Sequence, residues 1–437
     1  MTTDAAANGR AITSIRGFDQ RGVAGPESYE EAVLAFRAIF AQLAQTAGER
    51  DRTHTHAFDL VRQLTDAGIG RLRVPVEHGG YGVDLPTLFG LLAEAGQADS
   101  NVPQILRGHF SAVEILRHTP DDRVAGHWLR RIAAGAVFGN GQSEPAGANT
   151  SGAGFDISTH IHEVDGRAVV SGTKYYSTGS LYADHIRVAA LDPDGNRAFV
   201  VVPARHPGVT HVDDWDGIGQ RLTGSGTTHF HQVPVEPHGH LGLVQEALRP
   251  LPAFFQIVHL ANLAGIARSI RDETIAVVRS RQRTGVHALS SVASTDPEVL
   301  GVIGRLQARS LTVDTLLRQV AEGLEAADAE GAPEAYERNY IEVSAAQVAV
   351  IEAVLDAATI AYDAGGSSTV REGVHLDRHW RNARTLASHN PVVYKPRVIG
   401  DYLVNGTSPT YSHERPGQAR PAHSDSSSEP TNEGALP

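Results

Sequence analysis

Apolar side chains recur along this chain at two different spacings, and the spacing changes twice. Residues 27–135 show helical spacing: within residues 56–70 apolar positions return every three to five residues, and Gly68 suits a helix end. A further helix is predicted to start at Asp84, a capping residue that is followed by proline near the first turn. The first part of the chain is therefore predicted to be a helical domain.

Between residues 136 and 245 the pattern changes to short β-rich runs separated by turn residues. Asp165-Gly166 and Asp194-Gly195 stand between such runs, and Asp-Gly is typical of tight hairpin turns. Tyr175 and Tyr176 are expected to alternate on one of these strands and so to point to opposite faces. The middle of the chain is predicted to be a mostly antiparallel β domain.

Helical spacing returns from residue 246 to 405. The segment at 340–366 is apolar on nearly all sides, which predicts a deeply buried helix that ends at its glycine pair. Residues 1–26 are small and polar and are predicted to be flexible, and residues 406–437, rich in serine, proline and glycine, are predicted to be disordered. The whole pattern predicts an α+β protein of helical, β and helical domains.

Composition narrows the range of functions. The 437 residues are 41% hydrophobic with a net charge of -12, an ordinary soluble composition that argues against a general nucleic-acid surface. There is no cysteine, which excludes disulfides and thiolate chemistry. No signal-peptide core is visible and no apolar run approaches the roughly 18 residues of a membrane span, so a cytoplasmic protein without membrane contact is predicted.

Metal and nucleotide motifs are missing from the sequence. The 22 histidines include the pairs His54 with His56 and His229 with His231, but no spacing supplies the roughly four ligands of a structural metal site, so no metal is predicted. Residues 139–144 begin like a dinucleotide loop but lack its last glycine. Without a site for NAD(P)H, redox chemistry would take its electrons from a substrate or from another protein.

Three stretches resemble the acyl-CoA dehydrogenase superfamily. Ser143-Glu144-Pro145 matches its Thr-Glu-Pro segment, residues 174–179 match its Lys-x-Trp-Ile-Thr-Asn-Gly segment, and residues 279–287 look like its Arg-Lys-x-Phe-Gly segment. The similarity covers residues 30 to 405. It implies the fold of that family, with an N-terminal helical domain, a middle β-barrel domain and a C-terminal four-helix bundle, assembled as a homotetramer.

Residues 376–406 strongly resemble a narrower branch, the flavin-dependent dibenzothiophene monooxygenases and related sulfur-acquisition oxidoreductases. Where that branch has a His-Asp-Pro turn, this chain has His389-Asn390-Pro391. The resemblance implies reduced FMN delivered by diffusion from a separate flavin reductase, with oxygen added at flavin C4a as a hydroperoxide. Related N-oxygenases share the fold, so both sulfur and nitrogen substrates remain open.

A dehydrogenase of this family needs a glutamate base to remove an α-proton. At the two places where the family puts that base, this chain has residues 388–390 and His259, and neither place holds a carboxylate. The sequence therefore favours a two-component monooxygenase that oxygenates a sulfur or nitrogen atom of a small organic substrate. The alternatives are an acyl-CoA dehydrogenase-like enzyme with an unusual base and a non-catalytic flavin-binding protein.

The resemblance also implies where the chemistry lies. Thr178 matches the threonine beside flavin N5. His389 stands where the dehydrogenase base would reach the reacting face, and histidine gives or takes a proton near neutrality. The alternative is that His389 only caps a helix end before Pro391. Asn140 and His109 are predicted to lie near flavin and substrate. The alternative for Asn140 is a turn residue, and the alternative for His109 is a core residue.

Flavin contacts are predicted in the β domain and in the C-terminal helices, at Gln142, Ser143, Tyr176, Thr178, Arg281, Gly366 and Ser367. The family's Gln-x-x-Gly-Gly-x-Gly-Tyr segment, through which a neighbouring subunit holds FAD, corresponds here to residues 362–368, which lack the glutamine and end in two serines. Hydroxyls after a diglycine suit a phosphate. FMN is therefore predicted, with its phosphate near Arg281 and Ser367, and FAD is the alternative.

Overall fold

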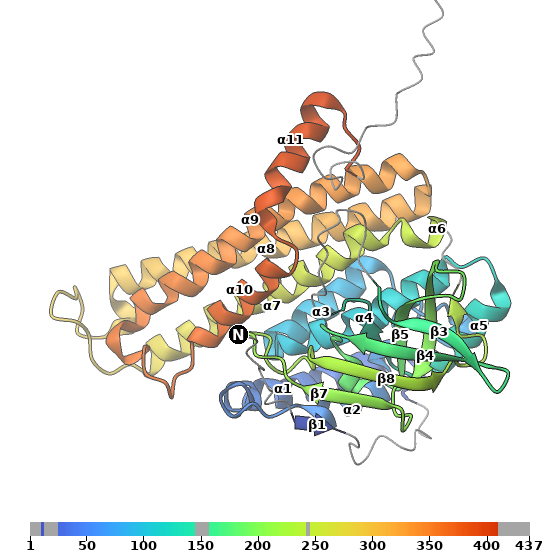
Figure 1. The fold of residues 1–437 in the computed structure, drawn as a ribbon. Coiled ribbons are helices and arrows are strands. Elements are labelled where there is room, and N and C mark those ends of the chain that lie inside the picture. Colours follow the sequence, from blue (N-terminus) through green and yellow to red (C-terminus); the bar gives the residue numbers. More distant parts are fainter. Residues whose placement is uncertain (1–9, 13–24, 145–156, 242–244, 410–437) are drawn as a thin grey trace, which may run out of the picture.

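The computed structural model describes residues 10–12, 25–144, 157–241 and 245–409. Its N-terminal part is a layer of helices, blue to cyan in Figure 1: α1 (Tyr29–Thr53), α2 (Phe58–Asp66), α3 (Leu85–Ala98), α4 (Asn101–Arg117) and α5 (Asp122–Ala133), with 3-10 turns at Ile69–Arg71 and Val76–His78. Local signals define these helix ends, as predicted. Gly68 follows α2 with a φ of 95°, and the Asp84 carboxylate caps α3 by accepting from the Thr87 N–H at 2.8 Å.

The middle of the chain forms one mixed sheet of β1 (Arg10–Ile12), β2 (Phe138–Gly141), β3 (His160–Val164), β4 (Arg167–Lys174), β5 (His185–Leu191), β6 (Arg197–Pro203), β7 (Val209–Asp213), β8 (Thr227–Pro234) and β9 (His240–Leu241), with a 3-10 turn at Ser180–Tyr182. Among the described strands the order is β1-β7-β8-β4-β3-β5-β6-β9, and β2 pairs in parallel with β5. Asp165-Gly166 joins β3 to β4, and Gly195, with a φ of 82°, turns the chain between β5 and β6. Both predicted hairpins are confirmed.

Two sequence predictions about this region are wrong. Residues 10–12, predicted to be flexible, form β1 and pair antiparallel with β7 at the sheet edge. Tyr175 and Tyr176 do not alternate on a strand, because β4 ends at Lys174 and the left-handed φ of 55° at Tyr176 breaks the strand geometry. The two rings consequently touch, with centroids 4.5 Å apart. Most of both predicted flexible ends lies outside the described residues.

The C-terminal part, yellow to red in Figure 1, consists of α6 (Gln245–Leu248), α7 (Leu251–Ser280), α8 (Pro297–Glu330), α9 (Pro333–Gly365), α10 (Asp377–His389) and α11 (Lys395–Asn405), with 3-10 turns at Ala293–Thr295, Gly366–Ser368 and Val392–Tyr394. Helices α7, α8 and α9 pack side by side, and α10 lies against α7 and α9. These four helices form the predicted bundle, and α11 packs on α9.

Two helices of the bundle are long and apolar enough, by length and composition, to cross a membrane. In α7, 89% of the apolar stretch is buried within the fold, which is the pattern of a core helix. In α9 only 50% of the apolar stretch is buried. The prediction that this helix is deeply buried is therefore wrong for a single chain. Its inner face packs on α7 and α8, whereas small outer residues such as Ala345 and Ala349 stay exposed.

One hydrophobic core joins the N-terminal and C-terminal helices. Phe89 on α3 and Phe254 on α7 are fully buried, and their ring centroids lie 5.3 Å apart. Burying such a side chain contributes roughly 1.5–3 kcal/mol. Because α3 and α4 pack on α7, and β2 packs on α4, the helices and the sheet are held in fixed positions around the space between them.

Candidate active site

A cavity of about 610 Å³ lies between α4, the end of β4, the loop after β7 and the last turns of α10. Four residues predicted from the sequence line it together: Ser143, Tyr176, Thr178 and His389. They come from segments far apart in the chain, so only the tertiary fold assembles them. None of the described residues that line the cavity is an aspartate or a glutamate.

A chain of hydroxyl groups runs inward from the cavity wall. The Oγ1 of Thr178 lies 2.8 Å from the Oγ of Ser225, which in turn lies 2.7 Å from the Oγ1 of Thr223. Thr223 donates its hydrogen to the Gln220 carbonyl at 2.9 Å, so Ser225 donates to Thr223 and Thr178 donates to Ser225. Thr178 therefore turns its oxygen lone pairs, and not its hydrogen, toward the cavity.

Ser143-Glu144 and β4 are clamped together behind the cavity. Lys174 is fully buried, and its Nζ lies 2.7 Å from a Glu144 carboxylate that also accepts from the N–H and the hydroxyl of Ser158 at 2.7 and 2.6 Å. Burial alone would raise the pKa of Glu144, but the bonds from Lys174 and Ser158 outweigh it and lower the pKa to about 2. Glu144 is thus an ionised anchor that holds neighbouring Ser143 at the cavity.

His389 ends α10 at a corner that it shares with α4 and α7. The Nη1 of Arg107 on α4 lies 3.2 Å from the His389 Nε2, and the His389 ring meets the ring of His259 on α7 with centroids 4.7 Å apart. A guanidinium only donates, so Nε2 accepts and the ring is neutral in this arrangement. Although the residue is open to the cavity, crowding of the ring by protein and then the charge of Arg107 lower the pKa of His389.

Two glutamines of the cavity wall have side-chain oxygens without a partner. Gln104 and Gln220 are buried lining residues, and the Oε1 of each has no hydrogen-bond partner among the described residues. Buried oxygens of this kind are nearly always hydrogen-bonded, and a bound water, or rotation of the side chain toward a ligand with N–H or O–H groups, would satisfy them. The ring and ribityl chain of FMN offer both kinds of donor, and Tyr176 and Trp215 add aromatic wall. The residues of the cavity fit a flavin.

The chain matches acyl-CoA dehydrogenases on both sides of its sheet. The acyl-CoA dehydrogenase N-terminal domain matches residues 27–136, and the acyl-CoA dehydrogenase C-terminal domain matches residues 257–394. The chain belongs to the acyl-CoA dehydrogenase family. The two places where the sequence resemblance puts the dehydrogenase base, residues 388–390 and His259, meet at the cavity corner through the rings of His389 and His259.

Within the acyl-CoA dehydrogenase family the chain is similar to oxygenases. It is 28% identical to dibenzothiophene monooxygenase of Rhodococcus qingshengii over 397 residues, which cover 87% of this chain and 94% of the relative. It is 28% identical over 393 residues to the probable FMNH2-dependent monooxygenase SfnC of Pseudomonas putida, covering 87% and 96%. It is 30% identical over 300 residues to L-evernosamine nitrososynthase of a Micromonospora species, covering 64% and 67%.

The fold agrees with the same branch. The crystal structure of FMN-bound TdsC from Paenibacillus sp. A11-2 is similar with a TM-score of 0.79 and 25% identity, covering 87% of this chain and 99% of the other. The predicted acyl-CoA dehydrogenase fold, and the monooxygenase branch predicted from residues 376–406, are confirmed.

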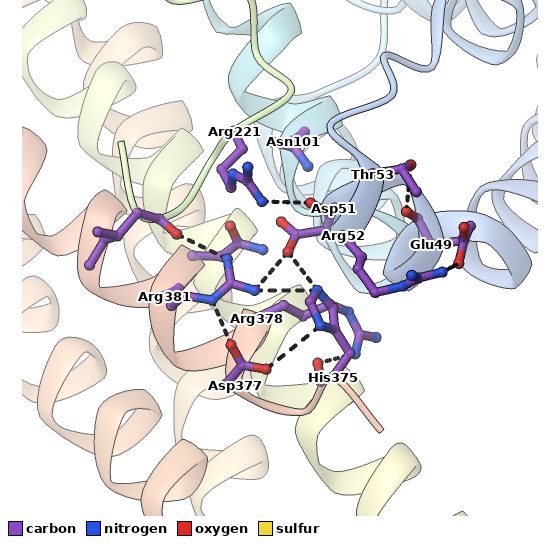
Figure 2. A network of polar contacts seen from close by, with 12 residues as sticks. Glu49, Asp51, Arg52, Thr53, Asn101, Arg221, His375, Asp377, Arg378 and Arg381 are labelled. Atoms are coloured by element: carbon purple, nitrogen blue, oxygen red, sulfur yellow. Dashed lines mark hydrogen bonds and ion pairs between the residues drawn. The ribbon is translucent and has the colours of Figure 1, made fainter. Parts of the chain in front are cut away.

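Figure 2 shows how α10 is fixed against the cavity in this family member. Asp51, near the end of α1, is buried, and its Oδ2 binds the Nη2 of Arg381 and the Nε2 of His375, each at 2.7 Å. Arg381 also donates to the Asp377 carboxylate at 2.7 Å and to the Ile218 carbonyl at 2.9 Å. Because Ile218 lines the cavity, this network ties α1 and α10 to the cavity wall.

The loop between β7 and β8 approaches α10 very closely. A Cβ atom on Gly219 would lie 2.2 Å from the Arg381 carbonyl oxygen, and the Gln220 N–H donates to the Asn382 side chain at 2.7 Å. Helix α10, which belongs to the stretch that resembles the family, therefore supports the cavity wall and also ends in His389. Sequence reasoning missed Gln220 and Ser225, because this loop has no periodic pattern and no motif to mark them.

His109 lies outside the cavity, and its predicted substrate contact is not supported. The residue is fully buried on α4. Its Nε2 lies 2.7 Å from the Gly70 carbonyl, and its Nδ1 accepts from the Phe138 N–H at 3.2 Å. Both ring nitrogens are thus engaged by backbone, which makes His109 the core residue of the alternative interpretation.

Asn140 and Gln142 border the cavity without lining it. Asn140 lies inside β2 and does not begin the strand, and its carbonyl accepts from the Ser180 hydroxyl at 3.1 Å. The Gln142 carbonyl accepts from Lys174 at 3.5 Å. Both residues belong to the backbone that leads to Ser143, and their contacts with flavin or substrate stay predictions.

Arg281, Gly366 and Ser367 lie where α7 and α9 end, and they are not among the residues that line the cavity. The Nη1 of Arg281 donates to the Ala364 carbonyl at 2.8 Å, and a Cβ on Gly366 would lie 3.3 Å from the other guanidinium nitrogen. Ser367 is exposed beside them. The fold brings the three predicted phosphate ligands into one cluster of a single chain, and their contact with FMN stays a prediction.

In the described part of the chain, one set of three groups has the spacing of metal ligands: His54, His56 and Asp213, with ligand atoms within 4.8 Å of one another. The Nε2 of His56 lies 2.9 Å from the Asp213 carboxylate, and its Nδ1 lies 2.8 Å from the Tyr182 hydroxyl. That hydroxyl donates to the Leu222 carbonyl at 2.6 Å, so it accepts from Nδ1. Hydrogen bonds to protein groups account for both ring nitrogens of His56.

Proposed function

We propose that this chain is a flavin-dependent monooxygenase that uses reduced FMN and oxygen to oxygenate a sulfur or nitrogen atom of a small organic substrate. The carrying observation is the make-up of the cavity, where hydroxyls, amides and a histidine converge and no described lining residue is a carboxylate. Proton abstraction of the dehydrogenase type needs such a base. The relatives named for dibenzothiophene oxygenation and FMNH2 dependence support the same assignment.

Several residues would hold FMN at this cavity. Thr178, whose hydrogen is committed to Ser225, is ready to accept from a flavin N–H, and Gln104 and Gln220 stand on the same wall with side-chain oxygens that have no partner among the described residues. The rings of Tyr176 and Trp215 add apolar surface that excludes water. When bound, reduced FMN supplies the electrons that activate oxygen.

His389 is the residue to which we assign proton transfer. It is open to the cavity, its ring is neutral, and Arg107 occupies its Nε2. The lowered pKa of His389 keeps the imidazole neutral at neutral pH, so it carries no fixed charge next to the substrate and relays a proton by holding it only transiently. No specific contact favours a non-catalytic role or a dehydrogenase role for this corner.

Three finer features belong to the same proposal. Reduced FMN would come by diffusion from a separate flavin reductase, since the sequence has no dinucleotide loop of its own. The enzyme would act in the cytoplasm. It would assemble as a homotetramer, which the half-exposed apolar face of α9 supports.

The test is reconstitution with a purified flavin reductase, NADH, FMN and ¹⁸O₂, with dibenzothiophene, methanesulfinate and a primary amine as trial substrates. We expect oxygen uptake only when the reductase is present, and one ¹⁸O atom in the product. Rapid NADH oxidation by the chain alone would contradict the two-component proposal. Anaerobic reduction of the flavin by an acyl-CoA would identify a dehydrogenase and overturn the monooxygenase assignment.

A further inference from the structure

Arg107 places a positive charge behind the histidine corner of the cavity. It extends from α4, one helical turn after the lining residue Gln104. Its guanidinium contacts the His389 ring at 3.2 Å and lies over Phe255, with 4.5 Å from Cζ to the ring centroid. Its Nε is buried and has no hydrogen-bond partner in the described part of the chain, and burial lowers the pKa of Arg107 to about 10.

This arginine has no counter-charge among the described residues, unlike others that are buried. Arg50 pairs with Asp99 at 2.6 Å, and Arg73 pairs with Glu114 at 2.8 Å, in both cases with almost no exposure. Taking a charge out of water is costly unless an opposite charge compensates for it. The environment of Arg107 therefore lacks one component, an anion.

An amide, and not an acid, follows His389 at this corner. The residue is Asn390, which lines the cavity. The Nδ2 of Asn390 donates to the Gln256 Oε1 at 3.1 Å, and Gln347 donates to the same oxygen at 2.7 Å. The corner thus combines an arginine, two histidines and amides, and the described lining has no carboxylate to neutralise it.

We propose that Arg107 and His389 form a subsite for a negatively charged group of the substrate. The substrate is then a small organic anion, such as a sulfinate or a carboxylate, that also carries the sulfur or nitrogen atom to be oxygenated. This substrate class rests on the proposed function. The flavin phosphate offers the same chemistry, but the cation predicted for it is Arg281, which lies with Ser367 outside the lining of the cavity.

Binding is tested in the flavin-free protein by ligand-observed NMR titration. The probes are methanesulfinate, its uncharged analogue dimethyl sulfone, and inorganic phosphate. Hydrogen bonds to charged groups contribute enough that the sulfinate should bind about tenfold tighter than the sulfone. Arg107→Met should raise the Kd of the sulfinate about tenfold to a hundredfold and leave the Kd of the sulfone unchanged. Asn390→Asp, which adds an acid beside the same corner, should also raise the Kd of the sulfinate.

Arg187 provides a matched control. It is a buried arginine without an ion pair among the described residues, and its Cζ lies 5.0 Å from the centroid of the Phe199 ring. Neither Arg187 nor Phe199 lines the cavity, whereas Arg107, itself outside the lining, contacts the lining residue His389. Arg187→Met should leave the Kd of the sulfinate unchanged. An equal loss in the Arg107 and Arg187 variants would mean a general loss of structure and would overturn the subsite.

Two further outcomes would also overturn it. One is equal affinity of the wild-type protein for sulfinate and sulfone. The other is that Arg107→Met weakens the binding of phosphate, and that of FMN measured by flavin fluorescence, while sulfinate binding is unchanged. That result would assign Arg107 to the flavin phosphate. These measurements need no turnover. If the proposed function were wrong but the subsite were right, the protein would still bind the sulfinate selectively, but no ¹⁸O would enter the product.

Discussion

Removal of the Asp51 charge tests whether the network of Figure 2 holds the cavity wall. In Asp51→Asn the side-chain volume hardly changes, but Arg381 loses the buried carboxylate that it binds at 2.7 Å, where the Asp51 side chain is only 3% exposed. Breaking a buried ion pair costs about 3–5 kcal/mol. Arg381 keeps its contact with Asp377, so we expect the lower end of this range, about 3 kcal/mol.

The Asp51→Asn substitution should have a small effect on the melting temperature and a large effect on local amide exchange. With an unfolding entropy of roughly 2.1 cal/mol/K per residue, 3 kcal/mol lowers the Tm of a chain of this size by only about 3 °C. If the loss concentrates in local opening, amide exchange should accelerate about a hundredfold in α10 and in residues 214–226. Hydrogen–deuterium exchange with mass spectrometry resolves these segments.

Asp377→Asn is the matched control for that measurement. Asp377 binds the same Arg381 at 2.7 Å, but its side chain is 55% exposed, and exposed ion pairs contribute only about 0–1 kcal/mol. Amide exchange in Asp377→Asn should be almost as slow as in the wild-type protein. Equal acceleration in the two variants, or acceleration spread over the whole chain, would refute the inference that Asp51 specifically anchors the wall.

Three other predictions concern the cavity. His389→Ala should lower product formation about a hundredfold to ten-thousandfold while oxygen is still consumed and appears as hydrogen peroxide, and unchanged coupling would remove His389 from the mechanism. Thr178→Val keeps the shape but removes the accepting oxygen, so a fluorescence titration should show FMN binding about tenfold weaker, and equal affinity would count against this contact. Because the pKa of Glu144 is lowered to about 2, its stabilising contribution is complete above its ordinary pKa of 4.5 and is lost as pH falls toward 2. Lys174→Met should abolish most of that dependence, and parallel stability curves from pH 6 to 2.5 would contradict this.

Features that depend only on neighbouring residues could be predicted from the sequence. The cap at Asp84, the glycine after α2 and the turns at Asp165-Gly166 and Gly195 all appear as predicted. Their conformations follow from short-range hydrogen bonds and allowed backbone angles, which a stretch of a few residues already specifies. Local motifs also identified the family and brought Ser143, Thr178 and His389 into consideration, and all three line the cavity.

Which polar side chains face that cavity depends on how distant segments pack. His109 and Arg107 lie two residues apart on α4, yet His109 binds backbone in the core and Arg107 reaches His389, 282 residues along the chain. The loop that supplies Gln220 and Ser225 gains its role through its contact with α10. Whether a polar group is satisfied, buried or left unpaired depends on partners distant in sequence, because burial and electrostatic pairing are set by packing and not by local pattern.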